Sequence, residues 1–349
     1  MLLGAGSAVL VLAGIRSVAW LVGPVFLALM IVIAIAPVQD ALLRHGWPAW
    51  LSTLVLVVLV TGVLVVFALV IVVSIARLAQ LLPQYADQAQ KAMTSIEGSL
   101  QGFGVEPGQL KSAVESVDPA KLVALIGAVL AGLSGLAASL VFLICLMLFL
   151  SVEAGGMNQR LAAVAADRPQ LETALRSFAK GTRSYLVVTA VFGLIVGVLD
   201  GAALWIIGVP LPVLWAVLSF LTNFIPNIGF IIGLIPPALL ALLTGGVSDM
   251  LLVIAVYCVL NFVIQTVIQP RFVGDSVGLA MTTTFVALVF WAWLLGPVGA
   301  LLAIPLTLLV KALLVDVDPT ARWANALAGS LERPPRESRR ARTGPSEEP

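Results

Sequence analysis

The sequence predicts an all-α polytopic membrane protein with about seven to eight transmembrane segments. Hydrophobic residues make up 60% of the 349 residues and charged residues only 11%, whereas soluble proteins carry about 25% charged residues. Uncharged runs such as residues 50–76 are longer than the ~20 residues that a helix needs to cross a bilayer. Two further apolar stretches are interrupted by proline and glycine, which indicates two re-entrant or broken-helix hairpin elements. The lipid bilayer is therefore the first expected partner.

Changes in composition divide the chain into six predicted regions. In order, these are N-terminal transmembrane helices (1–76), an extracytoplasmic amphipathic helical insert (77–120), a long transmembrane helix (121–152), a cytoplasmic basic helical loop (153–183), a C-terminal transport core with broken hairpins (184–315) and a largely disordered cytoplasmic tail (316–349).

The order of apolar and basic segments supports these boundaries. Residues 2–15 are apolar but short, and a stronger apolar run follows from Val18 to Val38. Asp118-Pro119 is a typical helix start, with Asp as the N-cap and Pro in the first turn. The 153–183 segment carries five Lys or Arg residues, and five arginines follow Leu331. Because basic residues favour the cytoplasmic side, we expect both segments in the cytoplasm and the insert outside.

A polar stripe marks the predicted helix from Asp249 to Gln269. Tyr257, Asn261, Gln265 and Gln269 recur every four residues, so they share one slowly winding face. Pro270 ends this helix because it pushes the preceding residue out of the helical conformation. Amide side chains in hydrocarbon need polar partners. The stripe is therefore either a set of interhelical contacts or the polar lining of a substrate path.

The expected span from Ser184 to Gly208 combines small residues with one acid. Gly193, Gly197 and Gly201 repeat every four residues, a pattern typical of closely packed membrane helices. Asp200 lies beside this face, and an acid within a span is a candidate ion or proton site. It is about eight residues from the expected end of the span, so the alternative is that it reaches the interface.

The stretch Thr222–Leu243 reads TNFIPNIGFIIGLIPPALLALL. Its two apolar arms are too short to span a membrane, and Pro226 and Gly229 break the helix between them. Transporters use such breaks because freed backbone groups and half-helix ends can bind substrate. We expect Asn223 and Asn227 to line that site, unless the break is a tight turn outside the membrane. The last apolar region repeats the pattern with Pro297 and Gly299.

Three blocks of sequence resemble the autoinducer-2 exporter family, also called the PerM-type permeases. They are NFIPNIGFIIGLIPPALLAL, NFVIQTVIQPRFVGDSVGL and GPVGALLAIPLTLLVKALL, and the resemblance extends in order over nearly the whole chain. It implies a homo-oligomeric transporter of the bacterial inner membrane that exports a signalling molecule or exchanges Na⁺ or Li⁺ for protons, with mobile hairpins. The sequence departs from the family pattern at Asn227, Phe230 and Ala280-Met281, where the family has an aromatic residue, a proline and His-Pro.

We therefore expect a secondary transporter of a small polar molecule, such as a signalling metabolite. The alternatives are a monovalent cation/proton antiporter, in which Asp200 titrates, and a non-transporting scaffold that binds a partner through the insert. The net charge of +1 and the single histidine argue against nucleic acid and against a multi-histidine metal site. No enzyme motif, paired carboxylates or nucleophile set appears within the spans, so neither catalysis nor a cofactor is expected.

The substrate path expected from the sequence combines the stripe with the two breaks. Its residues are Asn223, Pro226, Asn227, Gly229, Asn261, Gln265, Gln269, Pro270, Pro297 and Gly299, with Asp200 for ion coupling.

Overall fold

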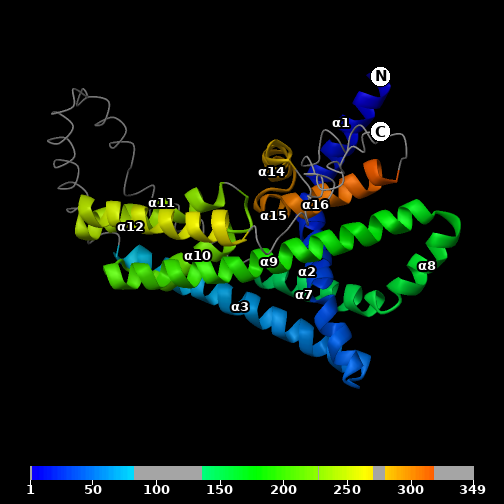
Figure 1. The fold of residues 1–349 in the computed structure, drawn as a ribbon, viewed down its shortest axis with the longest axis horizontal. Coiled ribbons are helices and arrows are strands. Elements are labelled where there is room, and N and C mark those ends of the chain that lie inside the picture. Colours follow the sequence, from blue (N-terminus) through cyan, green and yellow to red (C-terminus); the bar gives the residue numbers. More distant parts are fainter. Residues whose placement is uncertain (1, 82–135, 227, 270–279, 318–349) are drawn as a thin grey trace, which may run out of the picture.

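The computed structural model describes residues 2–81, 136–226, 228–269 and 280–317. Most of the expected insert and tail lie outside these residues, as do Asn227 and Pro270. Every element within them is a helix (Figure 1). The N-terminal helices are α1 (Leu2–Ser17), α2 (Ala19–Arg44), α3 (Ala49–Leu81), α7 (Leu136–Ala154) and α8 (Met157–Asp167). The C-terminal helices are α9 (Pro169–Ile207), α10 (Pro212–Thr222), α11 (Gly229–Gly245), α12 (Val247–Asn261), a π-helical turn (Phe262–Ile268), α14 (Met281–Leu295), α15 (Pro297–Leu301), α16 (Ala303–Lys311) and a second π-helical turn (Ala312–Asp316).

Fewer helices than expected are long enough to cross a membrane in the described part of the chain. Four pass by length and composition: Ala19–Arg44, Ala49–Leu78, Pro169–Ile207 and Val247–Ile268. A fifth span results if α7 and α8, bent by 60° at their junction, count as one. The expected seven to eight spans are thus not confirmed, because α10, α11 and α14 have only 11, 17 and 15 residues.

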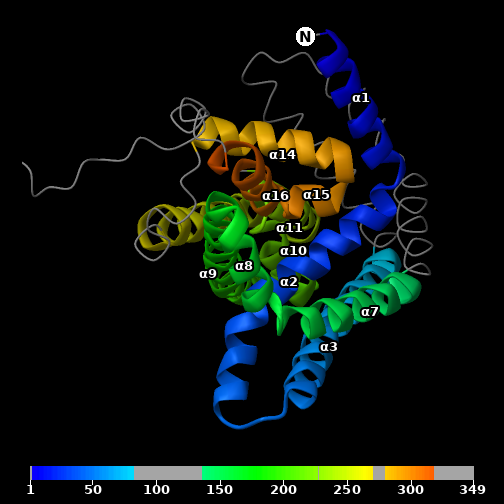
Figure 2. The same ribbon diagram turned by 90° about the vertical axis from the view of Figure 1, so that its right-hand side faces the viewer.

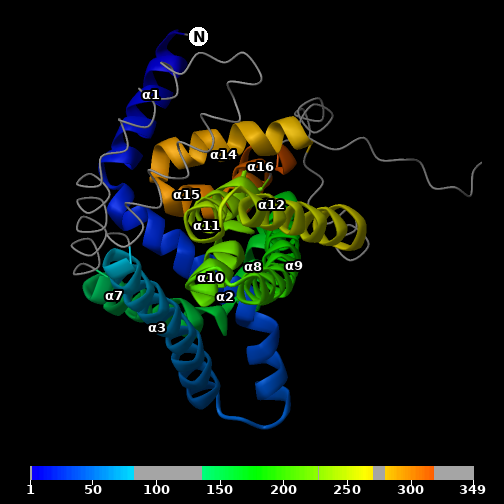
Figure 3. The same ribbon diagram turned by 90° about the vertical axis from the view of Figure 1, so that its left-hand side faces the viewer.

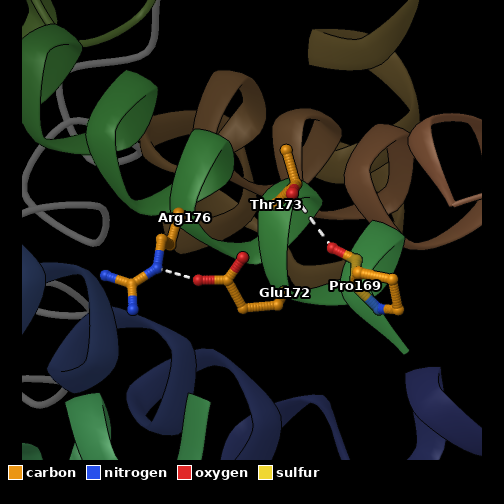
Figure 4. A network of polar contacts seen from close by, with 4 residues as sticks. All are labelled: Pro169, Glu172, Thr173 and Arg176. Carbon is orange, nitrogen blue, oxygen red and sulfur yellow. Dashed lines mark hydrogen bonds and ion pairs between the residues drawn. The ribbon is translucent and has the colours of Figure 1, made fainter. Parts of the chain in front are cut away.

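No structural boundary separates the polar segment 153–183 from the apolar span that follows it. The segment forms α8 and the start of α9, so the second part of the expected helical loop and the expected span from Ser184 belong to one continuous helix that begins at Pro169. Figure 4 shows the reason: Pro169 occupies the first turn, Glu172 pairs with Arg176, and the Thr173 hydroxyl donates to the Pro169 carbonyl at 2.9 Å. Proline and an acid suit a helix start, and an i,i+4 ion pair supports the first turns.

The helices form three layers around α9. The group α14–α16 lies on one side of α9–α12, and α3 and α7 lie on the other, with α2 crossing between them (Figures 2 and 3). One buried apolar cluster, which includes Met30, Leu294 and Leu306, joins α2 and α9 to α14–α16. A second, around Leu204, Trp215 and Tyr257, joins α9 to α10–α12. The long helix α9 therefore connects both halves of the molecule.

An arginine of α9 donates a hydrogen bond to a carbonyl of α2 that a proline leaves without its helical partner. Pro37 lies inside α2 and has no N–H, so the carbonyl of Ile33 loses its helical partner. The Arg183 side chain replaces it, donating from Nε to the Ile33 oxygen at 3.3 Å. This bond ties the N-terminal helices to the core.

The glycine face of α9 allows α10 to pack in close contact, as the spacing predicts. A Cβ atom at Gly197 would lie 2.6 Å from the carbonyl oxygen of Ala216, and one at Gly201 would lie 2.8 Å from the Ala216 Cβ atom. Neither distance leaves room for even a methyl group. Residues larger than glycine would force α9 and α10 apart.

The helix breaks expected near Pro226 and Pro297 are both present, and each produces a tight turn back. A Cβ atom at Gly229 would overlap the carbonyl oxygen of Thr222, so α11 starts directly against the end of α10. A Cβ atom at Gly299 would likewise overlap the carbonyl oxygen of Trp291, which brings α15 against α14. Both elements thus have a glycine within the first three residues of the returning helix. How they lie in the bilayer stays a prediction.

Candidate functional site

A buried cavity lies where α9, α10, α11 and α12 meet. The cavity has room for about one water molecule. The cavity is lined by Val196 and Asp200 of α9, by Ser219, Thr222 and Asn223 at the end of α10, by Phe230 and Gly233 of α11, and by Tyr257, Asn261 and Gln265 of α12 and the π-helical turn. Most of this lining is polar, within helices that are otherwise apolar.

The same helical face that carries the glycines points Asp200 into the cavity. Asp200 lies three residues after Gly197 and four before Leu204, and all three are buried in α9. Only 1% of Asp200 is exposed, and neither carboxyl oxygen has a hydrogen-bond partner. The face set by Gly193 and Gly197 thus turns Asp200 toward α10, and its depth in the membrane stays a prediction.

Two hydroxyl groups beside Asp200 are also unpaired. The Ser219 and Tyr257 side chains are 5% and 1% exposed, and their oxygens have no hydrogen-bond partner. The sequence-based set did not include Ser219 or Thr222. Their spacing with Asn223, three and four residues apart on α10, was the available signal, since it places all three on one helical face.

A chain of amide hydrogen bonds connects the helix break to α9 and α12. Gln265 Nε2 donates to Asn223 Oδ1 at 3.0 Å and to Asn261 Oδ1 at 2.8 Å. Asn223 Nδ2 donates to the Thr189 carbonyl of α9 at 3.1 Å, and Asn261 Nδ2 donates to the Tyr257 carbonyl at 2.9 Å. The stripe thus makes the interhelical contact that was one of its two expected roles, and its residues also line the cavity. Its role in a substrate path stays a prediction.

Gln265 lies in the π-helical turn Phe262–Ile268. Such turns are rare and often occur at functional sites. The regular four-residue spacing of the stripe gave no indication of it, because that pattern is equally typical of an ordinary α-helix.

Part of the expected substrate path lies away from the cavity. Pro226 is in the break itself, where Tyr185 of α9 donates to the Phe224 carbonyl at 3.0 Å and holds the backbone. Gln269 follows the π-helical turn and is not part of the lining. Pro297 and Gly299 belong to the second hairpin, beside an apolar cluster that includes Leu295. The cavity therefore brings together Asp200, Asn223, Asn261 and Gln265. Gly229 is not part of the lining and packs against Thr222, which is.

A family model described as AI-2E family transporter matches residues 6–317. The chain belongs to the AI-2E transporter family. A "Putative transport protein" of Haemophilus influenzae is 33% identical over 336 residues, which cover 95% of this chain and 96% of that protein. The "AI-2 transport protein TqsA" of Escherichia coli K12 is 30% identical over 88% of this chain and 89% of its own length. The "Putative transport protein YhhT" of the same strain is 31% identical over 89% of each chain.

Membership in the AI-2E family agrees with the architecture. The long apolar helices and the bacterial relatives indicate a transporter of the bacterial inner membrane. The match includes all four helices that form the cavity. The resemblance stated from the three sequence blocks is thus confirmed.

Proposed function

We propose that this AI-2E family protein is a secondary transporter that moves a small polar molecule through the cavity between α9, α10, α11 and α12. The observation that carries the proposal is the cluster of polar side chains between two helices long enough to span a membrane, α9 and α12 with its π-helical turn, and the shorter apolar helices α10 and α11. Polar groups inside a membrane protein are costly, and they usually mark the path of a substrate or ion.

The amide bonds around Gln265 are suited to exchange with a solute. Each such bond contributes only about 0.5–1.5 kcal/mol net, so a polar molecule that offers equivalent donors and acceptors can replace it. The break between α10 and α11 would supply the movement that admits the molecule. A signalling molecule is the first class to test, since the relative TqsA is named an AI-2 transport protein.

The test is solute flux in liposomes that contain the purified protein, against a panel of small polar metabolites. Asn261→Leu removes a link of the amide chain, and Gly229→Leu forces α11 away from Thr222. We expect both variants to insert and purify but to lose flux. Gly62→Leu is the matched control, because a Cβ atom at Gly62 of α3 meets nothing within 4 Å. Wild-type flux in Asn261→Leu would refute the assignment of the cavity.

A second candidate function is the exchange of Na⁺ or Li⁺ for protons. Asp200 favours it, because a buried and unpaired carboxyl group can exchange a proton for a cation. We expect the wild-type gene to restore growth of a sodium-sensitive host in high salt and Asp200→Asn to fail. Equal rescue by the Asn variant would remove Asp200 from the mechanism.

The scaffold alternative depends on residues 77–120, most of which lie outside the described residues. Binding of a partner through this insert therefore remains a prediction from the sequence. Homo-oligomeric assembly also rests on the family resemblance alone. Native mass spectrometry of the purified protein would measure it directly.

A further inference from the structure

The break between α10 and α11 leaves a backbone carbonyl that a side chain satisfies. In a regular α-helix the Phe224 carbonyl would accept from the N–H of Ile228. Here the Ile228 N–H donates to the Pro226 carbonyl at 2.7 Å instead. The hydroxyl of Tyr185 on α9 takes its place and donates to the Phe224 oxygen at 3.0 Å. Backbone carbonyls between packed helices need such a partner, so Tyr185 supports the break.

The ring of Tyr185 is itself fixed by its packing. It is buried in the apolar cluster that also includes Leu294 and Leu295 of α14, and Phe224 packs against the same cluster. Only the hydroxyl extends to the break. A tyrosine held in this way by its apolar ring offers a hydrogen-bond donor at a defined position.

A second bond from α9 holds the residue next to Phe224. Asn223 Nδ2 donates to the carbonyl of Thr189 at 3.1 Å, and Thr189 lies about one helical turn after Tyr185. One turn further along, a Cβ atom at Gly193 would lie 3.0 Å from the same Nδ2 atom. α9 therefore binds two successive residues of the break, Asn223 through its side chain and Phe224 through its backbone.

These bonds determine where the Asn223 amide points. The Phe224 N–H donates to the Leu221 carbonyl at 3.3 Å, and its carbonyl accepts from Tyr185. Both peptide planes that flank Phe224 are thus held, which leaves the chain beside Asn223 little freedom to rotate. In this orientation Asn223 lines the cavity and its Oδ1 accepts from Gln265 at 3.0 Å.

We propose that Tyr185 is a positioning residue of the substrate path: its hydroxyl fixes the break at Phe224, aims the Asn223 amide into the cavity and thereby sets the affinity for the transported solute. This inference rests on the proposed transport function. It adds to that function a residue outside the cavity lining, which acts through Asn223 rather than on the solute.

The kinetics of solute flux in liposomes test this role. Tyr185→Phe keeps the ring in its cluster and removes only the donor to Phe224. We expect the solute concentration at half-maximal flux, KM, to rise about two- to tenfold, the equivalent of one hydrogen bond. Maximal flux should change less than about twofold, because a loss of binding alone raises KM. A wild-type KM in this variant would overturn the proposal.

Thr182→Val is the matched control. Thr182 is a fully buried residue of the same helix, and its hydroxyl has no hydrogen-bond partner. The substitution therefore removes a hydroxyl from the interior of α9 at nearly constant volume without breaking a bond. We expect its KM to equal that of the wild type, and an equal rise of KM in both variants would show that Tyr185 has no specific role.

A double-mutant cycle on stability tests the positioning without any solute. In the described residues, the hydrogen bonds that lead from Tyr185 toward Gln265 pass through Phe224 and Asn223. We expect Tyr185→Phe to lower the thermal unfolding midpoint in detergent, and to lower it at most about half as much when Gln265→Leu is also present, because coupled residues are not additive. Midpoint shifts that add would contradict the positioning of Asn223 by Tyr185.

The two measurements separate this proposal from the proposed function. If no solute in the panel is transported but the midpoint shifts do not add, Tyr185 positions Asn223 and the transport function is at fault. If flux occurs with an unchanged KM in Tyr185→Phe and the shifts add, the role of Tyr185 is overturned and the transport function stands.

Discussion

Among single residues, Gln265 joins the most elements of the site. Its amide nitrogen donates to Asn223 at the end of α10 and to Asn261 of α12, and Asn223 in turn donates to α9. One side chain thereby relates the positions of three helices. A buried group of this kind costs far more to leave unpaired than it contributes when paired.

Gln265→Leu should therefore affect both stability and transport. It keeps an apolar side chain of similar length but leaves the amide oxygens of Asn223 and Asn261 without their donor. We expect a loss of about 1–3 kcal/mol, measured as a lower thermal unfolding midpoint in detergent, together with lost flux. Thr266→Leu, at the next and exposed position of the same turn, should change neither. A variant as stable as the wild type would show that water replaces the Gln265 bonds at no cost.

At the scale of elements, glycine positions determine how the core helices pack. Gly193, Gly197 and Gly201 let α10 approach α9, while Gly229 and Gly233 let α11 approach α10 from the opposite side. The short helix α10 is thereby held between two helices at near-contact distances. This explains how an element of 11 residues can carry three cavity residues in fixed positions.

Gly197→Ala should destabilise the protein because its added methyl group meets the backbone oxygen of Ala216 rather than a movable side chain. We expect a loss of about 1–3 kcal/mol, the typical cost of overpacking. Gly62→Ala, which meets nothing within 4 Å, should be neutral or stabilise its helix by up to about 1 kcal/mol. Thermal unfolding of both variants in one detergent checks the difference, and equal midpoints would contradict the packing argument.

The sequence predicts the elements of this core better than their boundaries. The glycine face, the two helix breaks and the polar stripe follow from local patterns with known periods, and the structure contains all three. The continuity of α9 from Pro169 into the span was not predicted, because polar residues such as Glu172 and Arg176 indicated a separate helical segment. Ser219 was missed because one serine in an apolar helix has no signal until its neighbours are known.

At the scale of the whole molecule, α9 joins the N-terminal helices to the C-terminal helices. α9 packs against α2 at one end, through Arg183, and against α10 and α12 around the cavity. The N-terminal helices and the hairpins therefore share one continuous helix as a support. We expect movement during transport at the contacts of α9 rather than within it.

The distribution of basic residues predicts how the whole molecule is oriented in the membrane, and reporter fusions can test this orientation. The basic segment 153–183 and the arginines after Leu331 predict that both lie in the cytoplasm. Green fluorescent protein fused to the C-terminus should fluoresce, and alkaline phosphatase at the same place should be inactive. Active phosphatase there would reverse the predicted topology.

The contacts between the helices around the cavity differ in strength, and this difference predicts where the cavity opens. The contacts that α10 makes with α9 and α11 pass through glycines at near-contact distances. A hydrogen bond from Gln265 to Asn223 joins the π-helical turn to the end of α10, and water or a solute can replace it. Breaking this bond requires less work than separating close-packed backbones, so we expect the site to open at the π-helical turn.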